Sequence, residues 1–263
     1  IEFFNSRKNL IEEKSQLIKT LKPNGFLILN ADDKDVVQMK NDGKHLVSTY
    51  GFQDGSDILA SGIDVLYASS GEPKGVIFRI DEKGSSLPVI IEGAFGKNHV
   101  YASLAALTLS SVLKLNMLDS INALKNYDIS PGRMRLLNGI KDSLIIDDTY
   151  NSSPTACESA LKTLGEIKNT GRRIAILGDM LELGRHTEEA HKNIGKIVKE
   201  ILNKNEDVLV TIGSRAQAIK SGAEEAGMNK EKIFEFLDSF QASDFIKTFV
   251  QKGDLVLVKG SQG

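Results

Sequence analysis

The residues best suited to do chemistry lie in one segment, 147–154. Two adjacent carboxylates, Asp147 and Asp148, follow an apolar run that is typical of a strand, and small polar residues then lead to Pro154, which opens a predicted helix. Carboxylates can bind Mg²⁺ or an amine, and backbone N–H groups at the start of a helix can bind an anion. The same residue types also suit an ordinary strand-to-helix turn with Ser153 as the N-cap residue. The spacing leaves both interpretations open, and both can hold together.

Two arginines form a second candidate group. Arg133 and Arg135 follow Pro131 and Gly132, at a point where the sequence pattern changes. An arginine at a hinge between domains can hold a phosphate group with two parallel hydrogen bonds, because its guanidinium is a planar fork. Arginines are also common on protein surfaces. The sequence by itself does not choose between a phosphate clamp and a surface position.

Three further candidates do not fit a chemical motif. Residues 93–98 contain two glycines and a lysine, but the glycines are too close together for a phosphate-binding loop, and asparagine follows the lysine. No other segment of the sequence fits that pattern. His186 and His191 are five residues apart, so they would not share a helical face as metal ligands do, and we expect a helix-start and a helix-surface residue. Cys157, the single cysteine, is expected to be a small packed side chain rather than a nucleophile.

The second half of the chain has the pattern of a doubly wound α/β domain. From residue 133 onward strands and helices alternate, which predicts a parallel sheet with helices on both faces. In such sheets ligands bind in the loops that follow the carboxyl ends of the strands, and those loops would include 147–151, 178–180, 213–215 and 259–261. We expect strands at 143–146, 173–177, 207–212, 232–236 and 254–258, and helices at 154–168, 186–202, 214–226 and 238–249.

The first half is organised differently. It begins with a predicted helix and a short strand, continues as an antiparallel meander, and ends in two helices. A break at residues 128–132 separates the halves, and we place a domain boundary there, with domains at 1–129 and 130–263. The expected helices are 6–21, 99–115 and 118–126, and the expected strands are 26–29, 58–68, 76–80 and 87–91.

Composition sets broad limits on function. The 263 residues include 33 Lys+Arg and 35 Asp+Glu, and this net charge of −2 gives no reason to expect a nucleic acid or a membrane surface as partner. The longest uncharged run, 100–113, is too short and too polar to span a bilayer. With one cysteine and no secretory signal at its start, the chain is expected in the cytoplasm. It starts at Ile1 and stops just after an apolar run, so we also expect a fragment of a longer protein.

Several ordered segments resemble the Mur ligases of peptidoglycan synthesis. They read FLILNADD (26–33), PGRM (131–134), IIDDTYNSSP (145–154) and ILGDMLELG (176–184), and the end of the chain, GDLVLVKGS (253–261), also fits. The first two are similar to segments of Mur ligases generally. The next two point to the branch of the family that adds D-alanyl-D-alanine.

The resemblance implies a three-domain protein with a UDP-sugar-binding domain, a central ATPase domain and a C-terminal Rossmann-like domain. This chain would hold the second half of the central domain, including the meander, and nearly all of the C-terminal domain. The phosphate loop would lie in the missing front. The implied reaction is an ATP-dependent amide ligation: ATP phosphorylates the carboxylate of UDP-N-acetylmuramoyl-tripeptide, and the amine of D-Ala-D-Ala attacks the acyl phosphate.

The resemblance also implies roles for individual residues. Lys14, otherwise a solvated helix lysine, aligns with a family lysine that is carbamylated, and a carbamate would be an oxygen ligand for Mg²⁺. Asp148 would be catalytic together with Lys14, and Arg133 and Asp148 match residues near the phosphates of ATP. The acceptor side would include Asn151, Ser153 and Lys259.

Adenine recognition departs from the family pattern. The family usually has a histidine followed by an asparagine after the meander, with a second asparagine three residues later, and the amides hold adenine. Here Asn98 precedes His99, and Ala102 stands at the later position. Asn98 and His99 remain candidates for ATP binding, either in a different arrangement or with His99 replacing the amide as the contact to the base.

Two other functions stay open. A non-catalytic nucleotide- or ligand-binding module would account for the absent phosphate loop and the altered adenine segment. A Mur-type ligase that adds a different amine would share the same motifs. For the ligase we expect a monomer, and the sequence does not determine the third residue of the tripeptide.

Overall fold

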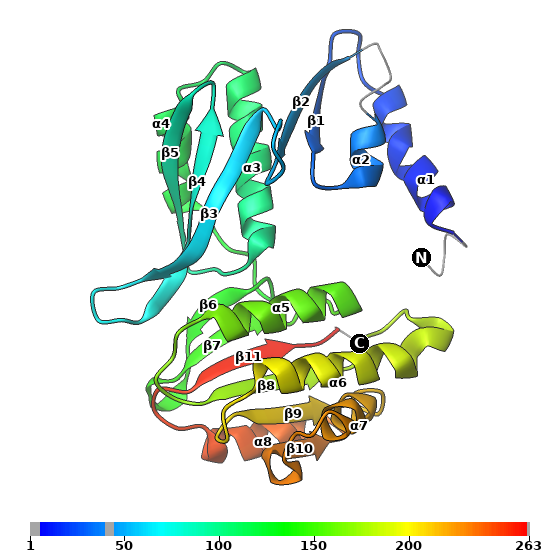
Figure 1. Cartoon of the computed structure of the whole chain (residues 1–263), viewed down its shortest axis with the longest axis vertical. Helices are drawn as coiled ribbons and strands as arrows, with labels where there is room; N and C mark the ends of the chain where they lie inside the picture. The colour runs from blue at the N-terminus through cyan, green and yellow to red at the C-terminus, as the bar shows by residue number, and fades with distance from the viewer. Residues whose placement is uncertain (1–5, 40–44, 262–263) are drawn as a thin grey trace. The chain divides into compact units, whose positions relative to one another are not determined.

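The chain forms two units, each built around its own sheet (Figure 1). The computed structural model describes residues 6–39 and 45–261. Both units are discontinuous in sequence. The division into domains at 1–129 and 130–263 stays a prediction from the sequence. Unit 1 combines Ile1–Leu66, Val76–Glu92 and Lys97–Asp128, and unit 2 combines Tyr67–Gly75, Gly93–Gly96 and Ile129–Gly263.

The first sheet has five strands in the order β1-β2-β3-β4-β5. Its strands are β1 (Phe26–Asn30), β2 (Leu46–Gly51), β3 (Ile58–Tyr67), β4 (Pro73–Glu82) and β5 (Ser85–Glu92). The helices of this part of the chain are α1 (Arg7–Lys19), α2 (Lys34–Gln38), α3 (Lys97–Val112) and α4 (Met117–Ala123), followed by the 3₁₀ turn η3 (Leu124–Asn126).

The strands of this sheet run parallel at one edge and antiparallel at the other. β1 pairs with β2 in parallel along its whole length, and β2 pairs in parallel with the start of β3. The neighbours β4 and β5 are joined by only Lys83 and Gly84, and a connection of two residues is possible only between antiparallel strands. This edge is the antiparallel meander that the sequence predicts, whereas β2 was not expected as a separate strand.

A carboxylate ties the end of β1 to two other parts of unit 1. Asp32 accepts hydrogen bonds from the hydroxyl of Tyr101 on α3 (2.8 Å) and from the backbone N–H groups of Phe52 (2.8 Å) and Gln53 (3.0 Å). Burial, together with the hydrogen bond to Asp32, raises the pKa of Tyr101 above its usual range. A Cβ at Gly51, the last residue of β2, would lie 2.8 Å from the Asp32 carboxylate, so a larger residue there would displace this side chain. Asp32 therefore stabilises the fold of unit 1.

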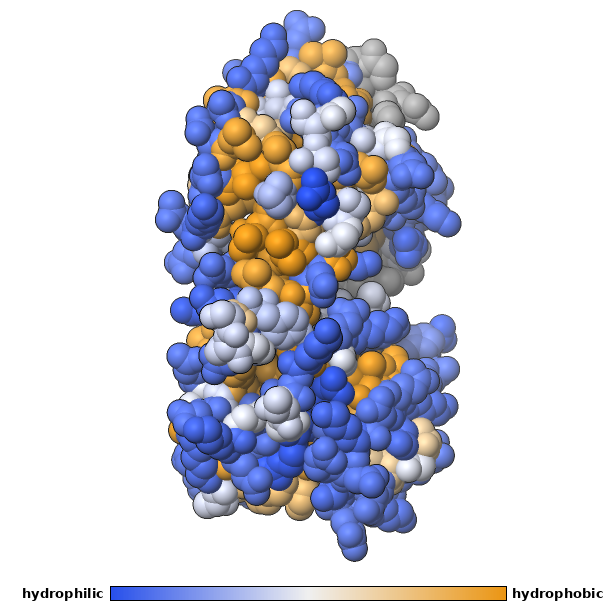
Figure 2. All heavy atoms as spheres, turned by 60° about the vertical axis from the view of Figure 1, so that its left-hand side comes forward, coloured by the Kyte–Doolittle hydropathy of each residue, from blue (hydrophilic) through white to orange (hydrophobic). Residues whose placement is uncertain are grey.

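The surface of unit 1 is partly apolar. Figure 2 shows hydrophobic side chains gathered over the visible face of unit 1, whereas hydrophilic side chains cover most of the visible face of unit 2. Four leucines near the end of α3 and the start of α4 are about half exposed: Leu109, Leu113, Leu115 and Leu118.

The second sheet has six strands in the order β10-β9-β8-β11-β7-β6. They are β6 (Arg135–Asn138), β7 (Leu144–Asp148), β8 (Arg173–Gly178), β9 (Val208–Ile212), β10 (Ile233–Phe236) and β11 (Leu255–Lys259). The helices are α5 (Pro154–Glu166), α6 (Thr187–Ile201), α7 (Gln217–Glu225) and α8 (Ser239–Phe249), with 3₁₀ turns η4 (Ile140–Asp142), η5 (Gly184–His186) and η6 (Lys230–Lys232).

Strand order decides how the helices cover this sheet. Strands β7 to β11 pair in parallel, and β6 is the antiparallel edge strand. The chain moves in one direction from β7 through β8 and β9 to β10, and then returns to place β11 between β8 and β7. Because parallel crossovers are right-handed, α5, α6 and α7 cover one face and α8 covers the other (Figure 1). This is the Rossmann-like, mostly parallel sheet that the sequence predicts.

The elements of unit 2 agree with the predicted pattern except at their ends. β7 continues to Asp148, two residues beyond the predicted strand, so both carboxylates belong to the strand rather than to the turn. β6 was not predicted. Helix α6 begins at Thr187, because residues 184–186 form the separate turn η5.

Candidate functional site

The loops after β7, β8, β9 and β11 meet at one edge of the unit 2 sheet, and a buried ion pair lies at their base. The ammonium group of Lys259, at the end of β11, is 2.6 Å from Asp148 at the end of β7. It also donates a hydrogen bond to the backbone carbonyl of Asn151 (2.9 Å). The Lys259 side chain is 1% exposed and that of Asp148 is 13% exposed. Lys259 therefore joins a catalytic candidate to the loop that carries two acceptor-side candidates.

The ion pair lies beside the cysteine. Burial is the main cause that raises the pKa of the Cys157 thiol to about 12, with the nearby Lys259 lowering it and Asp148 raising it. Cys157 is 1% exposed on α5. The thiol stays protonated at neutral pH, which agrees with a packed side chain and not with a nucleophile.

The segment 131–134 is fixed to the end of β7 by hydrogen bonds. The carboxylate of Asp147 accepts one from the backbone N–H of Gly132 (2.8 Å), and that of Asp148 accepts one from Met134 (3.2 Å). The N–H of Tyr150 donates to the carbonyl of Gly132 (3.1 Å). Gly132 has φ +72°, and a Cβ there would lie 2.7 Å from the backbone nitrogen of Tyr150. Only glycine allows this close approach of the two segments.

Arg133 is oriented by an aromatic ring. Its guanidinium carbon lies 3.8 Å from the centroid of the Tyr150 ring, and both residues are exposed. The stack holds the guanidinium next to the strand-end loops, where it could meet a phosphate group. Arg135, by contrast, lies in β6 opposite Asp147 and is half-buried.

Two of the acceptor-side candidates lie in the β7–α5 loop. Ser153 is exposed and is the N-cap residue of α5, where its hydroxyl accepts a hydrogen bond from the N–H of Ala156 (3.3 Å). The exposed Asn151 directs its side-chain oxygen to the N–H of Ser152 (2.8 Å). The capping interpretation of this segment is thus part of the structure, and the binding interpretation stays a prediction.

Ser261 connects two of the strand-end loops. The sequence analysis included it in the 259–261 loop but did not single it out. Its hydroxyl oxygen accepts hydrogen bonds from the N–H groups of Ser152 (3.2 Å) and Leu181 (3.4 Å). Its own N–H donates to the carbonyl of Asp179 (3.2 Å). The available signal was its position directly after the last strand, where ligands of such sheets bind.

The β8 and β9 loops are held by Asp179 and His191. Asp179 accepts a hydrogen bond from the N–H of Ala216 (2.7 Å). Nε2 of His191 accepts one from the N–H of Met180 (3.0 Å), which requires Nδ1 to carry the proton that faces the carbonyl of Thr187 (2.6 Å). His191 is fully buried, so the expectation of a helix-surface residue was wrong. Its polar atoms are satisfied by the β8 loop and the start of its own helix.

The remaining candidates belong to unit 1. Lys14 is exposed on α1, and Asn98 is exposed in the first turn of α3. His99 is buried, with its Nδ1 3.3 Å from the hydroxyl of Tyr127 and the two rings packed edge to face. The altered adenine segment therefore presents Asn98 to solvent and His99 to the interior of unit 1.

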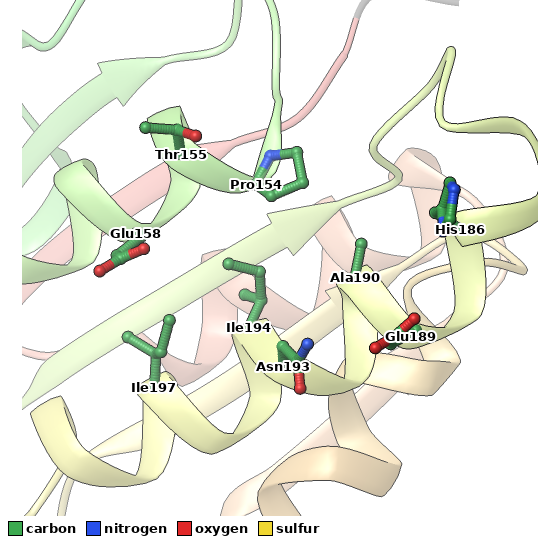
Figure 3. Close-up of a pocket in the computed structure, with 9 residues that line it drawn as sticks. All are labelled: Pro154, Thr155, Glu158, His186, Glu189, Ala190, Asn193, Ile194 and Ile197. Carbon is green, nitrogen blue, oxygen red and sulfur yellow. The ribbon is translucent and has the colours of Figure 1, made fainter.

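A groove of about 310 Å³ lies between α5 and α6 (Figure 3). Pro154, the first residue of α5, lies on the α5 side of it, and Ile194 and Ile197 of α6 contribute apolar side chains. Neither Asn151 nor Ser153 lines this groove. The acceptor-side candidates are thus next to it in sequence but outside its walls.

The described residues show neither a cluster of metal-binding side chains nor a membrane-spanning helix. Within residues 6–39 and 45–261, no three His, Cys, Asp or Glu side chains are grouped so that they could hold a metal ion. Within the same ranges, no helix has the length and apolar character needed to cross a membrane.

The sequence matches two parts of one protein family. Residues 1–110 match the family described as "Mur ligase middle domain", and residues 132–262 match "Mur ligase, glutamate ligase domain". The chain belongs to the Mur ligase family. The two matches agree with the resemblance of the FLILNADD, PGRM, IIDDTYNSSP and ILGDMLELG segments to Mur ligases.

Curated Mur ligases match nearly the whole chain. The UDP-N-acetylmuramoyl-tripeptide–D-alanyl-D-alanine ligase of Bacillus subtilis (strain 168) is 26% identical over 98% of this chain and 53% of its own length. The enzyme of the same name from Escherichia coli (strain K12) is 28% identical over 96% of this chain and 54% of its own length. The chain spans about half the length of the curated relatives it matches.

Solved Mur ligase structures share the fold. A MurF structure from Acinetobacter baumannii superposes with a TM-score of 0.80 at 24% identity, covering 98% of this chain and 54% of that one. MurF from Thermotoga maritima, solved in complex with ADP, superposes with a TM-score of 0.78 at 24% identity, covering 98% and 55%. At these identities the likeness shows the fold.

Proposed function

We propose that the protein containing this chain is an ATP-dependent amide ligase that joins D-Ala-D-Ala to UDP-N-acetylmuramoyl-tripeptide. The observation that carries the proposal is the match to curated ligases of that name over nearly the whole chain. In the proposed reaction the tripeptide carboxylate takes the γ-phosphoryl group of ATP. The amine nitrogen of D-Ala-D-Ala then attacks the acyl carbon, the amide bond forms, the amine loses a proton and phosphate leaves.

The proposed nucleotide contacts are Arg133 and Asp148 in unit 2, and Asn98 and His99 in unit 1. Phosphoryl transfer depends mainly on positioning and on charges placed near the phosphates. The Arg133–Tyr150 stack supports this role, because it holds a guanidinium at the strand-end edge. ADP bound to MurF of Thermotoga maritima supports ATP as the substrate.

Mg²⁺ is part of the proposal, with Lys14, as a carbamate, as the candidate ligand. Mg²⁺ in nucleotide enzymes is usually held by one or two carboxylates together with phosphates and waters. A carbamate on Lys14 would supply an oxygen ligand, and the exposed position of Lys14 on α1 leaves its amine accessible to CO₂. The ion would neutralise negative charge on the phosphates.

The acceptor side would be formed by Asn151, Ser153 and Lys259, with different roles. Two of the three N–H donors of the Lys259 ammonium group are used on Asp148 and on the Asn151 carbonyl, and the side chain is 1% exposed. We therefore propose that Lys259 positions the loop, while the exposed Asn151 and Ser153 side chains meet the acceptor. We further propose that the enzyme acts as a monomer in the cytoplasm, where ATP and UDP-linked precursors are present.

The test is the reaction itself, carried out with the full-length protein. ATP, Mg²⁺, UDP-N-acetylmuramoyl-tripeptide and D-Ala-D-Ala should give the pentapeptide product by mass spectrometry, with one phosphate released per amide formed. Asp148→Asn keeps the size of the side chain but removes its charge, and should lower kcat by roughly 100-fold. Asp244→Asn on α8, whose side chain is 80% exposed, is the matched control and should leave turnover unchanged. Equal turnover of the two variants would contradict the role of Asp148.

A ligase that adds a different amine is the second candidate. The structures that share this fold include UDP-N-acetylmuramate-alanine ligase from Thermotoga maritima (TM-score 0.69, 12% identity), so the fold alone does not select D-Ala-D-Ala. Supplying single amino acids in place of D-Ala-D-Ala separates the two. ATP binding without phosphate release with any of these amines would favour the non-catalytic module instead.

A further inference from the structure

A hollow, distinct from the groove between α5 and α6, lies near the amino ends of two strands of the unit 2 sheet. It has a volume of about 500 Å³ and is formed by the segment that leads from α6 into β9 and the segment that leads from α7 into β10. These segments precede the amino ends of the two strands. The candidate site described above lies at the carboxyl ends, so the two places are separated by the length of the sheet.

Three lysines from separate segments line this hollow: Lys199 in the last turn of α6, Lys204 before β9, and Lys232 at the end of η6. Within the described ranges, none of their ammonium groups has an ion-pair or hydrogen-bond partner. Other lysines of the same unit are paired with a glutamate, and examples are Lys192, Lys220 and Lys230. The positive charge in the hollow is therefore not neutralised by neighbouring side chains.

The one carboxylate that lines the hollow is held by the backbone. Asp207 is 1% exposed and accepts hydrogen bonds from the N–H of Arg173 (2.9 Å) and the N–H of Lys204 (3.2 Å). The carboxyl ends of α6 and α7 also reach this place, and each carries about half a negative charge. Three ammonium groups outweigh one carboxylate and two helix ends, so the hollow is positive overall.

Amide groups and an apolar floor complete the lining. The side-chain oxygen of Asn229 accepts a hydrogen bond from the N–H of Glu231 (3.0 Å), which leaves its two N–H donors for another acceptor. Asn203 and Asn205 are exposed in the same wall. Leu202 and Met228 are buried beneath. The hollow thus offers donors to an anion and a small apolar surface to an organic group.

We infer that this hollow binds a small organic phosphate, at a site separate from the ligase reaction. Lysine ammonium groups bind phosphate as compact charges, and amide N–H groups can donate to the remaining phosphate oxygens. The volume lies within the range of small-molecule sites. A recessed site of this size suits a small molecule better than the backbone of a nucleic acid, which would need an extended positive surface.

The first test is lysine reactivity in the full-length protein, with inorganic pyrophosphate as the probe; because labelling is read at each lysine, binding of the probe at the nucleotide site does not interfere. Amine acetylation is followed residue by residue by mass spectrometry. Pyrophosphate should slow labelling of Lys204 and Lys232 several-fold in a saturable manner. Lys230, which is close in sequence, 79% exposed and paired with Glu224, should label at an unchanged rate. Equal protection of all three lysines, or of none, would overturn the proposal.

The second test compares variants by calorimetry under the same conditions. Lys204→Ala combined with Lys232→Ala should weaken pyrophosphate binding by roughly tenfold or more, because two charged donors are lost. Lys230→Ala should bind like the unaltered protein. If both variants bind pyrophosphate equally well, the anion site lies elsewhere. The labelling result stands by itself if the double variant does not fold.

Discussion

Replacing Lys259 by methionine tests how the candidate site is held together. The side chain of Lys259 is almost completely buried, and its ammonium group contacts Asp148 (2.6 Å) and the carbonyl of Asn151 (2.9 Å). Methionine has a similar volume and fills the same space without a charge. The substitution therefore leaves the Asp148 carboxylate largely buried without its counter-ion.

The expected cost follows from the burial of Asp148. Removing one partner of a buried ion pair costs about 3–5 kcal/mol. Asp148 keeps the hydrogen bond from the N–H of Met134 (3.2 Å) and its side chain is 13% exposed, so we expect the lower end of that range. About 3 kcal/mol corresponds to roughly 100-fold in an equilibrium constant.

Hydrogen exchange is the assay, because it reports stability element by element in a protein of more than one unit. Amides of β7 and β11 should exchange roughly 100-fold faster in Lys259→Met, while those of β4 and β5 in the other sheet should not change. Adding Asp148→Asn removes the unpaired charge and should recover most of the protection. An effect smaller than about tenfold, or no recovery in the double variant, would refute the idea that the buried pair holds this edge together.

Three further predictions concern the same unit. Gly132→Ala should destabilise unit 2 by about 2 kcal/mol in thermal unfolding, because its Cβ would lie 2.7 Å from the nitrogen of Tyr150. The control is Gly71→Ala, which is also at positive φ but has nothing within 4 Å of its Cβ, and it should lower stability less. Equal losses of stability in the two variants would contradict the steric explanation. Arg172→Ala should lower the free energy of unfolding in urea by about 3–5 kcal/mol, because it leaves the carboxylate of Asp254, which is 2% exposed, without its ion-pair partner. A loss of less than about 1 kcal/mol would contradict this. Cys157 should resist iodoacetamide at pH 8 until urea is added, because burial raises its thiol pKa to about 12, and rapid labelling of the folded protein would contradict this. Since the pKa of the thiol is higher in the folded protein than in the unfolded one, its contribution to stability is complete below about pH 8.5 and is lost as the pH rises toward 12.

The sequence predicted most of the elements because their signals are local. Alternation of apolar runs with helical spacing gave β8, β9, β10, β11 and the four helices of unit 2 to within a few residues of their ends. The N-cap at Ser153 was also visible, since capping depends on a few adjacent residues. β6 escaped prediction because four residues, two leucines between two polar ends, carry no clear period. The end of β7 was misplaced because aspartates usually end strands, whereas here Asp147 and Asp148 are satisfied by segment 131–134.

The candidate residues divide in the same way. The resemblance assigned Asp148 to catalysis and the ATP phosphates and Asn151 and Lys259 to the acceptor side, but it did not show that Lys259 contacts the other two. His191 was misjudged because helical spacing does not show which polar residue faces the sheet. Ser261 was not singled out because a lone serine has no distinguishing pattern in a sequence. The roles of Lys14 in binding Mg²⁺ and of Asn98 and His99 in binding ATP remain predictions.

By itself, the sequence determined the α/β class, the strand–helix succession of unit 2 and the resemblance to Mur ligases, because periodicity, caps and motifs are written in neighbouring residues. The tertiary structure decided which distant residues meet. Lys259 and Asp148 are 111 residues apart, and they touch because the chain returns after β10 to insert β11 beside β7. That insertion depends on how the sheet is completed and covered, a property of the whole unit. The pairing and burial of the ion pair therefore follow from strand order, which no local pattern specifies.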